Sequence, residues 1–189
     1  MRLIVLDVEV TGLSPTMGDR IVEIGAVELC PNDLSVKSTF HKYINPDRHI
    51  PYCAVSIHGI DDEYVKDEPK FESIAQDFLN YIEGGTLVIH NPIFALGFIS
   101  QELELCNLPS IGNAPVIDTL EVARTLFPGK RISPDALLYR FEVDRIYPDL
   151  QGSLLVSSQL ADVYIALTKR YEGELPVKAV RDYILRQAI

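Results

Sequence analysis

The stretch Arg2-Leu3-Ile4-Val5-Leu6-Asp7-Val8-Glu9-Val10-Thr11-Gly12 decides the fold of this chain. Its apolar residues predict a buried strand that carries two carboxylates at its far end. Positions i and i+2 of a strand share a face, so Asp7 and Glu9 project the same way. A hard cation such as Mg²⁺ would relieve both their mutual repulsion and the cost of burying them. The pattern also fits solvated acids at a frayed strand end, or an acid that caps the Thr11-Gly12 turn, so the rest of the chain has to decide.

The composition is that of a single domain with a sizeable core, because 189 residues suffice to bury one. The chain has 17 Lys and Arg against 27 Asp and Glu, a net charge of −10. This balance argues against a broad electrostatic grip on nucleic-acid phosphates, but it leaves room for a small site that meets DNA or RNA through a metal ion. Cys30, Cys53 and Cys106 show no metal-site spacing and indicate reduced thiols. Without a signal-peptide pattern or a membrane-length apolar run, we expect a cytoplasmic protein with no membrane partner.

The order of the predicted elements favours an α/β domain with a mixed sheet. Three strands in succession indicate an antiparallel meander, and alternating helices and short strands follow it. The predicted strands are 2–8, 20–29, 35–44, 86–89 and 116–117, and the helices are 69–83, 92–106, one from about 119, one from 134 and 151–170. Residues 45–59 are predicted to be irregular, because prolines interrupt them. We expect one domain over 1–171 and a helical C-terminal extension over 172–189, which would lie against the body or a partner.

Seven segments of this chain carry a resemblance to a known family. They read DVEVTGL (7–13), RIVEIGAV (20–27), IHGI (57–60), VIHNPIF (88–94), FPGKRISPDAL (127–137), QGSLLV (151–156) and ADVY (161–164). In order and context they resemble the DEDD 3′→5′ exonucleases, in particular the proofreading epsilon subunits of bacterial DNA polymerase III. The resemblance covers roughly residues 2–170. It implies an RNase H-like exonuclease fold, a mixed sheet flanked by helices.

The resemblance also implies a catalytic centre, of which this chain keeps only a part. In the family, four carboxylates hold two metal ions at the scissile phosphate and a histidine acts as general base. Asp7 and Glu9 match the first two carboxylates, whereas Ala95 and Val156 stand in place of the other two and Gln151 replaces the histidine. Alanine and valine bind no cation, and a glutamine amide takes no proton at neutral pH. We therefore expect Mg²⁺ or Mn²⁺ to bind weakly or not at all.

Three nearby acids are candidates to replace the missing groups. Asp149 precedes Gln151 in a predicted loop. Glu102 follows Ala95 by seven residues, which puts it near the same helix face but about 10 Å further along. Asp162 lies on the far side of its helix from position 156. We expect none of them to restore the site, and we keep Asp149 as the ligand that an unexpected activity would use.

The family's substrate contacts map onto a further set of positions. The resemblance implies nucleotide binding by Thr11, Gly12, Leu13, His58, His90, Asn91 and Phe94. Several of these fit an ordinary structural role equally well. His90 and Asn91 are as consistent with a capping pair for the helix that begins at Pro92, and a histidine before Gly59 is most often a turn residue. Valines at 8 and 10 replace threonines that the family places beside the terminal nucleotide.

Together these observations predict a catalytically inactive or severely impaired exonuclease-type domain. We expect it to act as a binding module for a replication protein such as DNA polymerase III, or for the 3′ end of a single-stranded nucleic acid. One alternative is a slow, metal-dependent 3′→5′ exonuclease that uses a non-standard ligand such as Asp149. The other alternative is an adaptor unrelated to DNA.

Overall fold

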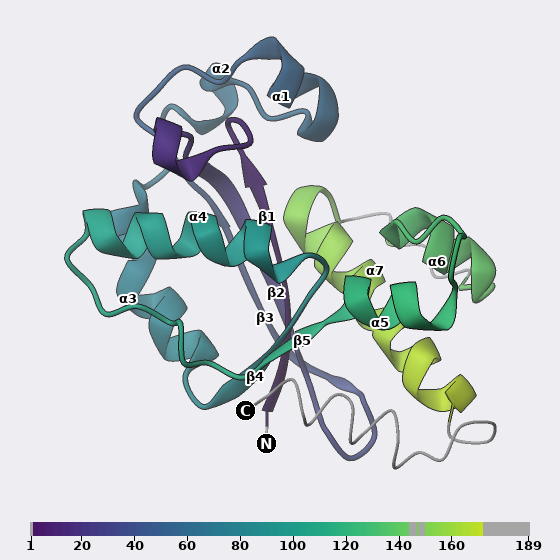
Figure 1. The fold of residues 1–189 in the computed structure, drawn as a ribbon. Helices are drawn as coiled ribbons and strands as arrows, with labels where there is room; N and C mark the ends of the chain where they lie inside the picture. The colour runs from purple at the N-terminus through teal and green to yellow at the C-terminus, as the bar shows by residue number, and fades with distance from the viewer. Residues whose placement is uncertain (1, 144–146, 148–149, 172–189) are drawn as a thin grey trace.

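The computed structural model describes residues 2–143, 147 and 150–171 of the chain. Their centre is a five-stranded sheet in the order β3-β2-β1-β4-β5 (Figure 1). The strands are β1 Arg2–Val10, β2 Ile21–Leu29, β3 Val36–Tyr43, β4 Gly85–Ile89 and β5 Val116–Asp118. β2 pairs antiparallel with β1 and β3, whereas β4 pairs parallel with β1 and β5. The predicted mixed sheet, a meander plus parallel strands, is confirmed.

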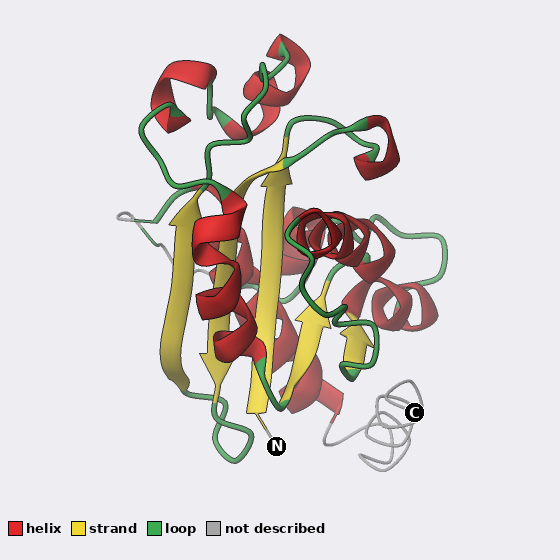
Figure 2. Ribbon diagram, turned by 90° about the vertical axis from the view of Figure 1, so that its left-hand side faces the viewer, coloured by secondary structure: helices red, strands yellow, loops and turns green. Residues whose placement is uncertain are grey.

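Helices cover both faces of this sheet (Figure 1, Figure 2). One face carries α3 (Phe71–Ile82) and α4 (Pro92–Leu105), and the other carries α5 (Thr119–Leu126), α6 (Pro134–Arg140) and α7 (Gly152–Tyr171). Beyond the carboxyl end of β1 lie the 3-10 turn η1 (Pro15–Met17) and the short helices α1 (Tyr52–His58) and α2 (Asp62–Val65). None of the described helices is long and apolar enough to cross a membrane.

The alternation of β1 decides which face receives its two acids. Ile4 and Leu6 belong to the core formed with α3 and α4. Leu3 and Val5 belong to the core formed with α7. Since side chains of a strand alternate between faces, Asp7 and Glu9 continue the row of Leu3 and Val5 and point to the α7 side.

Two expectations from the sequence are wrong in detail. Residues 45–59, expected to be irregular, include α1, which follows Pro51 and ends at Gly59. This helix buries only Ala54, so it leaves no periodic apolar pattern that sequence reasoning can detect. The first strand does not end at residue 8 but continues to Val10, because β2 pairs with it to that point. The expected C-terminal extension, residues 172–189, lies outside the described residues.

Candidate functional site

The acid-pair site, as we call the surroundings of Asp7 and Glu9, lies at the carboxyl end of the central strand. Both carboxylates are partly buried. In the β1–β2 ladder Asp7 stands opposite Gly25 and Glu9 stands opposite Glu23, and the register shifts immediately after Glu9. Such an irregularity ends regular pairing and is common next to active sites.

Burial and like charges disfavour ionisation of both acids. Burial raises the pKa of Asp7 well above its usual range, and the negative charges of Glu9 and Glu23 raise it further. Burial and the Glu23 charge raise the pKa of Glu9 to about 7. Two carboxylates with raised pKa values, projecting on one face, form an environment that favours a cation.

Glu23 is a member of this site that sequence reasoning missed. Its side chain is fully buried. One oxygen accepts a hydrogen bond from the backbone N–H of Ser153 at 2.9 Å, and the other lies 2.6 Å from Nε2 of His41. The signal that could have revealed it is a glutamate between the apolar residues Val22 and Ile24 of the second strand, since a buried glutamate needs partners.

The amino end of α7 is fixed directly on β2, beside the acid pair. Besides the bond from Ser153 to Glu23, the Ser157 hydroxyl donates to the Gly25 carbonyl at 2.7 Å. A Cβ at Gly25 would overlap the backbone of residues 153 and 154, so only glycine permits this approach. Because Gly25 stands opposite Asp7, this packing brings the start of α7 to the acid pair.

The three positions without catalytic groups lie around the same end of the sheet. Gln151 is exposed and Val156 is half-buried, both at the amino end of α7. Ala95 lies in the first turn of α4, which follows the strand parallel to β1, and is 3% exposed within the core on the α3–α4 side. Apolar side chains therefore occupy both positions where the family has its third and fourth carboxylates.

The candidate replacement acids that the structure describes have other partners. Glu102 is 1% exposed and accepts two hydrogen bonds from the Arg20 guanidinium, at 2.8 and 2.7 Å, and one from the Ile21 N–H at 3.1 Å. Asp162 is buried and accepts a hydrogen bond from the Tyr147 hydroxyl at 2.6 Å. Asp149 lies outside the described residues.

The loop after β1 places Thr11 and Gly12 inside a closed turn. Thr11 is fully buried, its N–H donates to the Arg20 carbonyl at 2.9 Å, and its hydroxyl accepts from the Arg20 N–H at 3.0 Å. Gly12 packs against the carboxylate of Asp19, which also accepts a hydrogen bond from the N–H of Ser14 at 3.0 Å. These contacts hold the loop that presents Leu13, so Thr11 and Gly12 position this loop, and nucleotide binding by them stays a prediction.

His58 has both ring nitrogens engaged with the backbone. Its Nε2 lies 3.2 Å from the Val10 carbonyl, and its Nδ1 accepts from the Ile60 N–H at 3.0 Å. Burial lowers the pKa of His58, which favours the neutral ring that these two bonds require. His58 thus ties the end of α1 to the end of β1 and leaves only its ring face for a ligand.

His90 and Asn91 are not the capping pair that the sequence allowed. Nδ1 of His90 lies 3.0 Å from the Thr119 hydroxyl, and burial lowers the pKa of the ring. Asn91 precedes α4 in the left-handed conformation (φ 69°), and its side chain makes no capping hydrogen bond. It remains exposed, with its amide available to a ligand. The Phe94 ring packs against the ring of Phe98, with centroids 5.1 Å apart and planes tilted by 59°, so Phe94 is partly a core residue.

Exposed apolar side chains gather at the same end of the sheet. Leu13 is 81% exposed in the loop after β1, Ile57 is 81% exposed in α1, and Ile93 is 86% exposed in the first turn of α4. The sequence identified only Leu13 among them. Large exposed apolar residues around a polar centre are typical of a binding surface.

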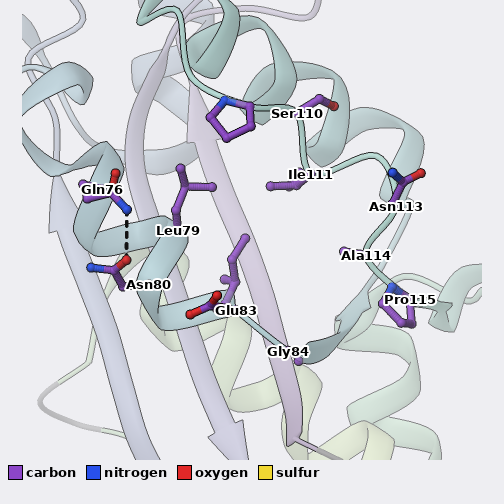
Figure 3. A pocket seen from close by; sticks show the side chains of 13 residues that line it. Gln76, Leu79, Asn80, Glu83, Gly84, Ser110, Ile111, Asn113, Ala114 and Pro115 are labelled. Carbon is purple, nitrogen blue, oxygen red and sulfur yellow. Dashed lines mark hydrogen bonds between the residues drawn. The ribbon is translucent and has the colours of Figure 1, made fainter.

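A separate cavity of about 490 Å³ lies at the opposite end of the sheet. It lies between the end of α3 and the loop before β5, and includes Leu79, Ile111 and Pro115 (Figure 3). Gln76 and Asn80 share a hydrogen bond of 2.9 Å along one wall. Glu83 is the one acid or base among its lining residues, so this cavity lacks the grouped carboxylates that metal-dependent hydrolysis requires.

The donor set of the acid-pair site does not fit a two-metal centre. Among the residues that the structure describes, no three or more His, Cys, Asp or Glu side chains are arranged to hold a metal ion. Glu23 is close enough to affect the pKa of both acids, but its oxygens already serve Ser153 and His41. The site therefore offers two carboxylates to a divalent cation, too few for the family's pair of ions.

This sheet order, with two acids at the end of its central strand and the amino end of α7 beside them, defines an RNase H-like exonuclease domain. A family model described as Exonuclease (RNase_T) matches residues 4–147. The chain is 48% identical over 171 residues to the DNA polymerase III subunit epsilon of Rickettsia prowazekii, covering 89% of this chain and 74% of that protein. It is 44% identical over 174 residues to the same subunit of Escherichia coli, covering 88% and 71%. The chain therefore belongs to the exonuclease family, as a homologue of DNA polymerase III subunit epsilon.

Solved structures support the same fold. The nuclease domain of 3′hExo, a DEDDh family member bound to rAMP, matches with a TM-score of 0.75 at 17% identity and covers 89% of this chain and 92% of that one. Exonuclease X in complex with 5′ overhanging duplex DNA matches with a TM-score of 0.65 at 24% identity and covers 88% and 92%. At these identities the likeness concerns the fold alone.

Proposed function

We propose that this chain is an epsilon-type exonuclease domain with little or no hydrolytic activity, which binds the 3′ end of a single-stranded nucleic acid at the acid-pair site. The observation that carries this proposal is that the exonuclease fold is kept while two of the family's carboxylates and its general base are replaced by other residues. Asp7 and Glu9 lie on the α7 side of the central strand, while Ala95 in the first turn of α4 and Gln151 and Val156 at the amino end of α7 offer neither a carboxylate nor a base.

The size of the missing contributions argues against efficient hydrolysis. Removing a general base alone costs roughly 10²–10⁴ in rate. Each missing metal clamp removes several kcal/mol of transition-state stabilisation. These effects do not add simply, yet each of them is large.

Retained surface features support binding. Leu13, Ile57 and Ile93 expose apolar side chains at this end of the sheet. Asn91 presents an exposed amide beside them. The apolar faces of bases can pack against such aliphatic side chains, which removes apolar surface from water. Two carboxylates also bind Mg²⁺ or Mn²⁺ weakly when substrate phosphates complete the coordination shell.

The names of the curated relatives add a partner to the proposal. They are subunits of DNA polymerase III, and we propose that this chain associates with a replicative polymerase. Co-elution of the purified chain with the polymerase subunit of its own organism tests this association, and separate elution contradicts it.

An exonuclease assay with the full chain tests the loss of activity. A labelled single strand is incubated with the wild type and with Asp7→Ala in Mg²⁺ or Mn²⁺. We expect no shortening by either protein, but binding of the strand by the wild type. Progressive 3′→5′ shortening that Asp7→Ala abolishes would contradict the proposal and favour an active enzyme with other ligands. Absence of any strand binding would favour an adaptor unrelated to nucleic acid.

A further inference from the structure

A second surface pocket, the α6 pocket, lies on the same side of the sheet as the acid pair. Its volume is about 550 Å³, and it is lined by Arg131, Ser133, Asp135, Ala136, Tyr139 and Arg140. α6 lies among the helices of the α7 side, toward which Asp7 and Glu9 point (Figure 1). The acid pair and the α6 pocket therefore share one face of the sheet.

The two arginines of this pocket have no acidic partner among the described residues. This is unusual in a chain with a net charge of −10, where acids outnumber bases. Asp135 also lines the pocket, so two guanidinium groups face one carboxylate. The balance leaves positive charge available to an anion.

Arg140 is held in place before any ligand arrives. Its guanidinium lies 4.6 Å from the centre of the Phe127 ring, and one of its nitrogens donates to the Arg131 carbonyl at 3.4 Å. Its Nε is buried and has no hydrogen-bond partner. Because this Nε is buried, a ligand would meet the remainder of the guanidinium group. Guanidinium groups bind phosphate with strong, charge-assisted hydrogen bonds, so a phosphate suits the arginines of this pocket.

Tyr139 adds an aromatic surface to the same pocket. Its side chain is 89% exposed, so the ring is open to a ligand. Arginine and an open aromatic ring side by side form the usual surface for single-stranded nucleic acid, in which phosphates meet the cation and a base stacks on the ring.

The segment that lines the pocket passes close to His90. This residue directly follows β4, the strand next to β1. The backbone of Ile132, between the pocket residues Arg131 and Ser133, lies beside the His90 ring. Since the acid pair and the α6 pocket also share the α7 side of the sheet, the pocket is a candidate contact for the nucleotides upstream of a 3′ end at the acid pair.

We propose that the α6 pocket binds the phosphodiester backbone of a single-stranded nucleic acid upstream of its 3′ end, with Arg131 and Arg140 on phosphate and Tyr139 against a base. This inference rests on the proposed function, because it assumes that the 3′ end lies at the acid-pair site.

The test measures binding of fluorescein-labelled oligo(dT) by the full chain, using fluorescence anisotropy. Two lengths are compared, about 4 and about 16 nucleotides, which span the site sizes of common single-strand binding folds. The variants are Arg131→Glu and Tyr139→Ala, both at exposed positions. The control is Lys37→Glu, which makes the same charge change at an exposed position near the start of β3.

We expect Arg131→Glu to weaken binding of the long strand about tenfold, and Tyr139→Ala to weaken it by a similar factor. The two pocket variants should change the affinity for the short strand less than about twofold, because the short strand does not reach the pocket. Lys37→Glu should change the affinity for the long strand less than about twofold, because Lys37 does not line the pocket. For Arg131→Glu, binding of the long strand should also depend less on salt. The slope of log K against log salt should become less steep by about 0.7 for each phosphate that the variant no longer neutralises.

Three outcomes overturn the inference. If Arg131→Glu and Lys37→Glu weaken the long strand equally, the effect is one of total charge, and the proposed function still stands. If Arg131→Glu weakens both lengths alike, the pocket is not an upstream site. If the wild type binds neither strand, the proposed function fails together with this inference. Melting curves that match the wild type establish that each variant is folded.

Discussion

The side chain of Glu23 holds a negative charge inside the protein, next to two other acids. Its buried oxygens serve Ser153 and His41, which lie on different elements. The same charge raises the pKa of Asp7 and of Glu9. At neutral pH the ionised acid pair therefore lowers the free energy of unfolding unless a cation offsets its charge. Such electrostatic destabilisation is common at functional sites.

The pKa of Glu9 predicts a pH-dependent gain in stability for Glu9→Gln. Glu9 has a pKa of about 7 in the folded chain against an ordinary value of 4.5, so the folded state holds this proton more tightly than the unfolded state. The resulting stability is complete below pH 4.5 and is lost as the pH rises through about 7. Glutamine does not ionise, so in metal-free buffer above that range the variant should be about 1–2 kcal/mol more stable.

Urea unfolding across this pH range measures the difference between Glu9→Gln and the wild type. Glu104→Gln, a change at an exposed position, is the matched control and should have no effect. A gain for Glu9→Gln that is the same at every pH would contradict the assignment of the effect to ionisation.

The same repulsion predicts weak stabilisation by a divalent cation. Millimolar Mn²⁺ should raise the melting temperature of the wild type by about 2–5 °C, as expected for a ligand present somewhat above its dissociation constant. Asp7→Asn should abolish this rise, because it removes one of the two carboxylates. Differential scanning fluorimetry with and without EDTA measures it, and an equal rise in both proteins would place the ion elsewhere.

At the scale of elements, the contact between α7 and β2 determines the shape of the site. Gly152 directly precedes Ser153, has a φ of 55°, and packs against the carboxylate of Glu23. Because Gly25 also allows close approach, the start of α7 lies directly on the strand that faces the acid pair. The position of Val156 and Gln151 thus depends on two glycines and one glutamate.

Gly152→Ala should destabilise the chain by about 2–4 kcal/mol, since a Cβ would overlap the Glu23 carboxylate and the backbone is left-handed. Gly129→Ala is the matched control. It has a φ of 71° with open space around it, so it should cost only about 1 kcal/mol of backbone strain. Chemical denaturation measures both variants. Equal destabilisation would show that overlap with Glu23 contributes nothing.

On the scale of the whole molecule, the fold does not depend on the catalytic groups. Ala95 is buried within the core and contributes apolar packing where a carboxylate would have to be desolvated. Val156 is half-buried beside the acid pair. The sheet and its two helical layers form with alanine and valine at these two positions, so the loss of hydrolysis that we propose would leave the fold in place.

Restoring the family's groups together predicts a gain of activity. The triple variant Ala95→Asp, Gln151→His, Val156→Asp should shorten a labelled strand at least about 10²-fold faster than the wild type. Each single variant should remain close to the wild type, because groups that act as a unit are strongly non-additive. A triple variant that melts as a folded protein but remains inert would show that the positions no longer converge.

The sequence by itself determined the order of the five strands, the meander and the shared face of Asp7 and Glu9, because local periodicity and strand alternation carry that information, whereas it missed α1. It also predicts which of the family's catalytic groups are missing, since residue type alone decides whether a side chain binds a cation or takes a proton. Only the tertiary structure decided the roles of Glu23 and Glu102. Their partners lie far away along the chain, 130 residues for Ser153 and 82 for Arg20. A buried charge is tolerated only where the folded chain brings such partners to it. Contacts between residues so far apart in the chain cannot be predicted from the local sequence pattern.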